Sequence, residues 1–311
     1  MPRLALVCRE GTAPLWRKLS VSPDQRNRDG ISIQAVGVVV QRHPRRGNLD
    51  PFYVEFIRGM ESVLLDSGFN LMLQICRSSE EEIARYHHWA RTGAVRAVLV
   101  VDLQTDDPRP GIVRGLGLPA VILGNPGLGK GLPAVWTNDG AAMRDAVTYL
   151  SVLGHRHIAH VGGPVQLFHT QERDAAFFAT AKEYGMSAEA AHADYTEAGG
   201  ARETATLFAQ PFGLRPTAII YDNDLMALGG RSHLLQAGCS IPGDISLLAW
   251  DDSLGCQLAG LSALSRDLAA YGALAARTLL DRIQGSSTGR HLAEIPHLVV
   301  RESTGPCNPR L

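Results

Sequence analysis

The stretch TAIIYDNDLMALGG, at residues 217–230, joins a predicted strand to a predicted helix through three polar residues. Its apolar run from Thr217 to Tyr221 is typical of a strand, and a helix is predicted from about Asp224 to Gln236. Asp and Asn are preferred at helix N-termini because their side chains accept hydrogen bonds from backbone amides. Capping requires only one of the three polar residues at 222–224, so a second amide or carboxylate is free for a ligand.

Strand and helix alternate in the same way along most of the chain. Apolar runs predict strands at residues 36–40, 71–75, 97–101, 120–123, 157–161, 245–250 and 298–300. Apolar periodicity and end signals predict helices at about 53–64, 79–91, 139–153, 171–185 and 267–284. The S-x-x-E pattern of Ser79 and Glu82 predicts a capping box for the second of these helices. The alternation indicates an α/β fold of two doubly wound lobes with parallel sheets, because the unit recurs about twice.

The residues that follow each apolar run are candidates for ligand contact. In open α/β sheets, ligands bind beyond the carboxyl ends of the strands. The candidates lie at residues 50–53, 102–105, 124–125, 162–164, 222–224 and 251–252.

The composition is that of a soluble globular protein, with 45% of 311 residues hydrophobic and 20% charged. A net charge of −1 does not favour nucleic-acid binding by the whole surface, although a small separate module is compatible with it. Five scattered cysteines, without a C-x-x-C spacing, are expected to be reduced thiols. No apolar stretch approaches the roughly 18 residues of a membrane span, and the N-terminal run is too short for a signal peptide. A cytoplasmic protein without membrane contact is therefore expected.

Two patterns resemble sites of other chemistry. Gly124–Gly131 matches a phosphate loop except at its last position, and a strand-like run follows instead of a helix, so a surface loop is expected. His155, His157 and His160 suggest a metal site, but a strand would point the last two to opposite faces, so polar surface or loop histidines are expected. No G-x-S-x-G pattern occurs, and no nucleophile is paired with an oriented base. Neither catalysis nor a metal or other cofactor is expected.

Four segments resemble LacI/GalR-type transcription regulators, in that family's order and spacing. They are Asp50–Tyr53, Leu153–Ala159 with Gly162–Pro164, Asp222–Gly229 and Ile241–Asp252, within a similarity over about residues 35–304. The resemblance implies a type I periplasmic-binding-protein-like fold, with two lobes joined by three crossovers near residues 154, 265 and 296. The first lobe is then expected at about 35–153 and 266–296, the second at about 154–265 and 297–304, and a tail at 305–311.

The resemblance also implies a function. Such cores are typically homodimers that sense a small polar effector, here expected to be a sugar, by lobe closure, and that bind operator DNA. Family members normally begin with a helix-turn-helix of roughly 20 residues and a hinge helix, whereas residues 1–34 contain no recognisable helix-turn-helix. The alternative is a solute-binding protein for sugar uptake without DNA binding. An enzyme on the same scaffold is disfavoured because the catalytic residues are missing.

The ligand-binding residues are implied by the same resemblance. Arg173 matches the effector-binding arginine of the family, whose guanidinium donates to hydroxyls or to a carboxylate. The other candidates are Asp50, Phe52, Tyr53, Asp139, Tyr195, Asn223, Asp251 and Arg266. Alternatives remain open: Arg173 pairs with Glu172 or Asp174 on a solvated helix, Asp251 caps a turn, or one of the two aromatic residues packs in the core.

Overall fold

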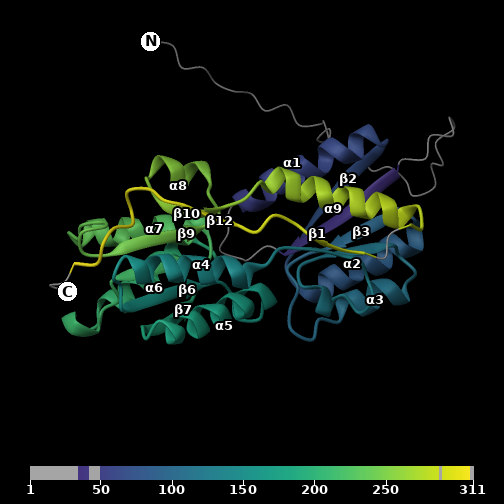
Figure 1. The fold of residues 1–311 in the computed structure, drawn as a ribbon. Helices are drawn as coiled ribbons and strands as arrows, with labels where there is room; N and C mark the ends of the chain where they lie inside the picture. The colour runs from purple at the N-terminus through teal and green to yellow at the C-terminus, as the bar shows by residue number, and fades with distance from the viewer. Residues whose placement is uncertain (1–33, 42–49, 287–288, 309–311) are drawn as a thin grey trace, which may run out of the picture. The chain divides into compact units, whose positions relative to one another are not determined.

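The computed structural model of the chain describes residues 34–41, 50–286 and 289–308. In this part of the chain, two six-stranded sheets are each covered by helices on both faces, which confirms the predicted α/β fold of two lobes (Figure 1). The atypical segment expected at residues 1–34 lies outside the described residues, apart from Gln34 at the start of β1.

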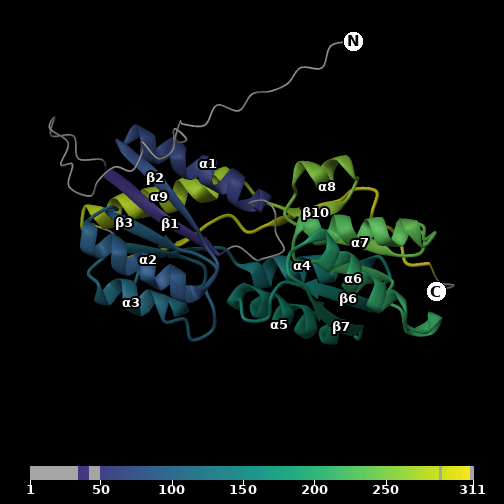
Figure 2. The ribbon, with the colours of Figure 1, turned by 180° about the vertical axis from the view of Figure 1, so that it is seen from behind.

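The first sheet has the strand order β11-β5-β4-β3-β1-β2, and all its strands are parallel. Its strands are β1 (Gln34–Gln41), β2 (Phe69–Cys76), β3 (Ala97–Val100), β4 (Ala120–Leu123), β5 (Ala134–Trp136) and β11 (Arg290–Leu292). Helices α1 (Pro51–Asp66) and α9 (Leu268–Ile283) cover one face, and α2 (Ser79–Thr92) and α3 (Arg109–Gly115) cover the other. Although α9 lies more than 200 residues after α1, the two helices run side by side in both views (Figures 1 and 2).

The apolar run in β1 reflects burial on both faces of the sheet. Val36, Val38 and Val40 pack beneath α1 and α9, whereas Ala35 and Val39 pack against the α2 side. Gly37 lies between them because a Cβ there would come within 2.5 Å of the Trp89 ring. Only glycine therefore allows α2 to pack this closely on β1.

The second sheet has the strand order β12-β10-β9-β8-β6-β7. Its strands are β6 (His157–Gly162), β7 (Ser187–His192), β8 (Ala218–Tyr221), β9 (Ser246–Trp250), β10 (Ser262–Ser265) and β12 (His297–Val299). Helices α4 (Asp139–Val152) and α5 (Phe168–Glu183) cover one face, and α6 (Glu197–Phe208), α7 (Asp224–Gln236) and α8 (Leu254–Leu258) cover the other. The last strand, β12, pairs antiparallel with β10, unlike the parallel strands that the alternation predicts. Short 3₁₀ turns occur at Pro126–Leu128 and Phe212–Leu214.

The chain passes between the two sheets three times. The passages lie between β5 and α4, between β10 and α9, and between β11 and β12. The first differs from the expected crossover near residue 154, because α4 packs on the second sheet. Met143, Val147 and Leu150 of α4 join one apolar core with Ile158 and Phe177. The sequence reveals the apolar stripe of α4, but it does not reveal which of the two sheets that stripe packs against.

The predicted capping box of Ser79 and Glu82 is wrong by one residue. Ser78 is the N-cap of α2, and its hydroxyl accepts from the Glu81 amide at 3.3 Å. Glu82 is instead fully buried and forms an ion pair with Arg109 at 2.8 Å. Arg109 lies 27 residues after Glu82 in the sequence. The Glu82 carboxylate, which the local pattern assigns to the N-terminus of α2, is therefore bound by a residue distant in the sequence.

Candidate functional site

A polar cavity lies at the carboxyl ends of strands from both sheets. It encloses about 950 Å³ of space, including the part open to solvent, in the size range of small-molecule sites. Side chains on the segments that follow β3, β4, β5, β8, β9 and β10 line it, together with the start of α1 and of α5. All nine side chains predicted to contact a ligand line this cavity: Asp50, Phe52, Tyr53, Asp139, Arg173, Tyr195, Asn223, Asp251 and Arg266.

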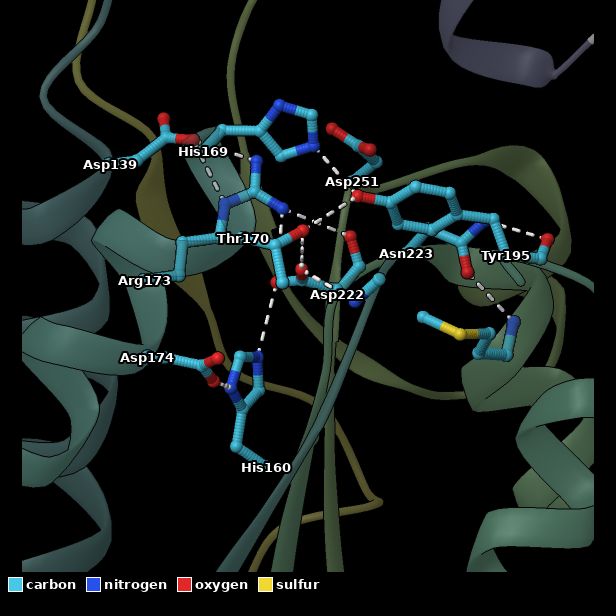
Figure 3. Close-up of polar contacts among 12 residues, drawn as sticks. Asp139, His160, His169, Thr170, Arg173, Asp174, Tyr195, Asp222, Asn223 and Asp251 are labelled. Carbon is cyan, nitrogen blue, oxygen red and sulfur yellow. Dashed lines mark hydrogen bonds and ion pairs between the residues drawn. The ribbon is translucent and has the colours of Figure 1, made fainter. Parts of the chain in front are cut away.

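Arg173 is held by carboxylates from two other elements (Figure 3). Its Nε and Nη2 atoms lie 2.9 and 2.8 Å from Asp139 Oδ2, and its Nη1 lies 3.0 Å from Asp222 Oδ1. The guanidinium also stacks 3.7 Å from the centre of the Trp250 ring. Burial lowers the pKa of Arg173, but the two carboxylates outweigh burial and hold it above the usual value. The alternative pairing with Glu172 or Asp174 is wrong, because both side chains have other partners.

Behind Arg173, Asp222 continues the network into the interior. Asp222 also accepts hydrogen bonds from His160 Nε2 at 3.1 Å and from the Gly163 amide at 3.0 Å. The other ring nitrogen of His160 donates to Asp174 at 2.8 Å. Burial lowers the pKa of His160, yet the charge of Asp222 and the bonds to both carboxylates raise it to about 9. Asp222 is ionised for the converse reason, since Arg173 and His160 hold its pKa well below the usual value against the effect of burial.

The histidine prediction is therefore wrong in part. His160 is a fully buried residue of β6, and His155 lies in the loop before β6 as predicted but is buried, with 1% exposure. His157 is partly exposed, with Glu189 at 3.6 Å. Among residues 34–41, 50–286 and 289–308, there is no group of three or more His, Cys, Asp or Glu side chains with the geometry to hold a metal ion.

Asn223 serves both the fold and the cavity. Its Oδ1 accepts from the Met226 amide at 2.9 Å, which caps α7, and its Nδ2 donates to the Tyr195 carbonyl at 3.2 Å. One N–H of the amide remains for a ligand. Tyr195, at φ +60°, occupies the space left by the missing side chain of Gly163, where a Cβ would lie 2.1 Å from the ring. Its hydroxyl forms a hydrogen bond with His169 at 2.7 Å.

Arg266 and Asp251 face each other with a looser geometry. Arg266 lies 3.7 Å from Asp251 and 3.8 Å from Asp139, both longer than a hydrogen bond. Arg266 Nε and Asp139 Oδ1 are buried and have no hydrogen-bond partner in the described part of the chain. Burial raises the pKa of Asp251 to about 7, although Arg266 and Arg173 oppose that effect. This side of the cavity therefore has hydrogen-bonding capacity that the protein itself does not use.

The start of α1 forms the aromatic wall. Asp50 caps the helix by accepting from the Phe52 amide at 3.0 Å. Tyr53 is 6% exposed and belongs to the apolar core of the first sheet, while its hydroxyl donates to Asp102 at 2.7 Å. Phe52 is less buried, and Arg266 lies 5.5 Å from the centre of its ring. Of the two aromatic residues, Tyr53 thus packs mainly in the core, as one of the open alternatives states.

A strap of hydrogen bonds joins the two lobes at one end of the cavity. The Phe168 amide, at the start of α5, donates to the Leu103 carbonyl at 2.9 Å. Next to it, the Thr105 hydroxyl donates to Gln171 Oε1 at 2.8 Å. The residue that caps α5, Leu167, has no side-chain cap bond, so the other lobe supplies a backbone acceptor to this helix end.

The sequence interpretation missed further residues of the lining. They include His169, Glu172 and Tyr271, whereas Asp102 and Asn125 lie in stretches that the sequence analysis named as candidates for ligand contact. His169 and Glu172 are three residues apart, and with Arg173 they share one face of α5. That spacing was available as a signal, but the helix is predicted to begin at 171, and it begins at Phe168. The glycine-rich stretch at 124–131 forms a 3₁₀ turn that leads into β5 rather than into a helix.

Two doubly wound sheets with a polar cavity at their carboxyl ends define the class of periplasmic-binding-protein-like domains. The profile of the periplasmic binding protein-like domain matches residues 147–304. Two curated relatives are transcriptional regulators. AglR of Rhizobium meliloti is 30% identical, with coverage of 84% of this chain and 75% of the relative. CelR of Thermobifida fusca is 28% identical, with coverage of 95% and 89%.

Solved structures are similar over most of the described chain. A LacI family transcriptional regulator from Bifidobacterium animalis subsp. lactis has a TM-score of 0.80 at 33% identity, with coverage of 88% of this chain and 98% of that one. A complex of the transcriptional regulator CelR with cellobiose has a TM-score of 0.79 at 27% identity, with coverage of 87% and 84%. The chain belongs to the LacI family of transcriptional regulators. Across its described segments, no helix has the length and apolar character to cross a membrane.

Proposed function

We propose that this core senses a small polyhydroxylated effector, a sugar, in the cavity between its sheets, and that occupancy controls operator binding by a homodimer. The observation that carries the proposal is a pair of buried atoms on the cavity wall, Asp139 Oδ1 and Arg266 Nε, without hydrogen-bond partners among the described residues. Buried polar atoms in folded proteins are almost always hydrogen-bonded. Hydroxyl groups suit both atoms, because a hydroxyl donates to a carboxylate and accepts from a guanidinium.

Two further observations support a sugar. Phe52 presents a ring on the cavity wall, against which the C–H face of a pyranose packs. The similar regulator CelR has been solved with cellobiose, a disaccharide. The DNA-binding part of the proposal is supported by family membership, and residues 1–33 lie outside the described residues.

The test is a titration of the full chain with neutral mono- and disaccharides, followed by thermal unfolding and calorimetry. A ligand that binds the folded state raises the melting temperature. Arg266→Gln should weaken the binding of an active sugar by about ten- to a hundredfold, because a charge-assisted hydrogen bond contributes about 1.5–3 kcal/mol. Arg58→Gln is the matched control, since Arg58 is an exposed residue of α1. A panel of sugars, nucleosides and amino acids that leaves the melting temperature unchanged would exclude a sensing cavity.

The regulatory part is tested by gel shift. The full chain is incubated with its own upstream DNA, with and without the active sugar. We expect specific binding that the sugar strengthens or weakens. Binding that ignores a sugar known to occupy the cavity would contradict the proposed coupling.

A further inference from the structure

The lining of the cavity carries an excess of negative charge. Six carboxyl groups line it beside two guanidiniums: Asp50, Asp102, Asp139, Glu172, Asp222 and Asp251 against Arg173 and Arg266. Asp251, with its pKa raised to about 7, is partly protonated at neutral pH, so the excess comes from the other carboxylates. His169 does not add a positive charge at neutral pH, because burial and the nearby Arg173 lower its pKa. A neutral sugar leaves this excess in place when the cavity closes around it.

The two guanidiniums and His160 are already committed to specific carboxylates. Arg173 binds Asp139 and Asp222, and Asp222 is also bonded by His160. Arg266 lies nearest to Asp251 and Asp139. Each of these three cations thus already lies next to Asp139, Asp222 or Asp251.

Asp102 and Glu172 take part in none of these ion pairs. Within the described residues, neither has a Lys, Arg or His nitrogen at ion-pair distance. Asp102 accepts a hydrogen bond from the neutral Tyr53 hydroxyl, and Glu172 a long one, 3.4 Å, from Asn125. Burial, and then the charge of Asp139, raise the pKa of Glu172, and the hydrogen bond from Asn125 and the charge of Arg173 only partly oppose them.

Asp102 and Glu172 both line the cavity, one on each lobe, and each lies close in sequence to a residue of the strap. Asp102 directly precedes Leu103, whose carbonyl binds the Phe168 amide, and Glu172 lies one helical turn after Phe168. Asp102 is close enough for its charge to act on His169, and that of Asp139 acts on Glu172. The buried, unpartnered Asp139 Oδ1 also lines this space, on a side chain that is only 5% exposed.

We propose, resting on the proposed sugar-sensing function, that the effector is an aminated sugar whose protonated amine is held by Asp102 of the first lobe and Glu172 of the second. An ammonium group has three donors and no acceptor, which matches a wall of carboxylate oxygens. The hydroxyls of the same ligand then face Arg266, which lies 3.8 Å from Asp139. A bare metal ion fits less well, because no cluster of three or more candidate metal ligands exists in the described segments.

The test compares sugars that differ only by an amino group in place of the 2-hydroxyl. The pairs are glucosamine and glucose, galactosamine and galactose, mannosamine and mannose, and the β-1,4-linked glucosamine dimer and cellobiose. Dissociation constants are measured by calorimetry on the full chain at about pH 6.5, below the pKa of a typical amine. In at least one pair, the aminated member should bind about tenfold or more tightly than its partner, as a charge-assisted bond requires.

Variants that remove one carboxylate charge test whether Asp102 and Glu172 cause the tighter binding of the aminated sugar. Glu172→Gln and Asp102→Asn should each reduce the ratio within that pair toward one, chiefly by weakening the aminated member. Asp145→Asn, at an exposed position of α4 away from the cavity, should leave the ratio unchanged. Circular dichroism confirms that each variant is folded.

The outcomes separate the inference from the function on which it rests. Tighter binding of a neutral sugar, or a ratio that both variants leave unchanged, overturns the aminated effector while sugar sensing stands. Binding of neither member of any pair, nor of any other sugar, overturns both. Added Ca²⁺ that makes a neutral sugar bind as tightly as its aminated partner also overturns the inference, because an inorganic cation then supplies the missing charge.

Discussion

His160 is a buried cation between two carboxylates, and its stabilising contribution depends on pH. It faces Asp174 and Asp222 directly, and Arg173 lies on the far side of Asp222 (Figure 3). Asp174 also pairs with His192 at 2.8 Å. The pKa of His160 is raised from an ordinary 6.5 to about 9 in the folded state. The folded chain therefore binds this proton more tightly than the unfolded chain does. The resulting stability is fully present below pH 6.5 and is lost as the pH rises toward 9.

We predict that the free energy of unfolding of the ligand-free chain falls by about 3 kcal/mol between pH 6.5 and 9, since one pKa unit corresponds to about 1.4 kcal/mol. Urea unfolding at a series of pH values measures it. His160→Gln should flatten this slope, whereas His157→Gln, at a partly exposed position, should retain it. A wild-type chain whose stability is constant or rises over this range would refute the assignment.

At the scale of single residues, the sequence predicts which side chains face the cavity better than it predicts their partners. The candidates follow apolar runs, and parallel sheets bring such residues to one edge. Partners come from distant parts of the chain: Asp139 lies 34 residues before Arg173, and Asp222 lies 49 residues after it. No local spacing encodes these pairs. The same reason explains the misplaced capping box, because the partner of Glu82 is Arg109.

At the scale of elements, the strap couples the start of α5 to the loop after β3. Its bonds exist only while the two lobes are close together, so they favour the closed arrangement that surrounds a ligand. Thr105 and Gln171 supply its side-chain bond outside the cavity lining.

We predict that Thr105→Val weakens effector binding by about two- to tenfold, since a neutral hydrogen bond contributes about 0.5–1.5 kcal/mol. The melting temperature of the ligand-free chain should change little, because the bond is exposed. Thr92→Val is the matched control, as its hydroxyl bonds only within α2. Calorimetry with the active sugar provides the measurement. Equal affinities for the two variants would mean that the strap does not contribute to closure.

Whether an element could be predicted depends on where it lies in its sheet. The central strand β1 is buried on both faces and therefore has a continuous apolar run. The edge strand β7, SAEAAH, is only partly buried, and the sequence interpretation did not assign it. Helix α4 was predicted but was placed in the first lobe instead of the second, because an amphipathic stripe identifies a packed face and not the surface that it packs against.

At the scale of the whole molecule, the edge of the first sheet that is formed by β2 exposes apolar side chains. Met72, Leu73 and Ile75 of the edge strand β2 are between 37% and 47% exposed, and Leu65 at the end of α1 is 62% exposed. Exposed apolar edge strands favour association with another chain. We propose that this edge takes part in the contact between the two chains of the homodimer.

We predict that Leu73→Glu combined with Ile75→Glu yields a monomer in analytical ultracentrifugation at concentrations where the wild type is a dimer. Two buried apolar contacts are replaced by charges that repel each other across the interface. Val152→Glu, at an apolar position on α4 that is 79% exposed, should leave the dimer intact. A wild-type monomer, or a double variant that still dimerises, would place the interface elsewhere or remove it.

The three passages between the sheets also bear on how the chain is synthesised. The face of β1 that carries Val36, Val38 and Val40 is covered by α1 together with α9, and α9 begins at Leu268. At ribosomal rates of about 5–20 residues per second, roughly 10 to 50 s separate the synthesis of β1 from that of its covering helix. The second sheet likewise waits for β12 at His297–Val299. The nascent chain therefore exposes one unfinished apolar surface until α9 emerges and a second until β12 emerges, and such exposed apolar surface is what chaperones at the ribosome protect.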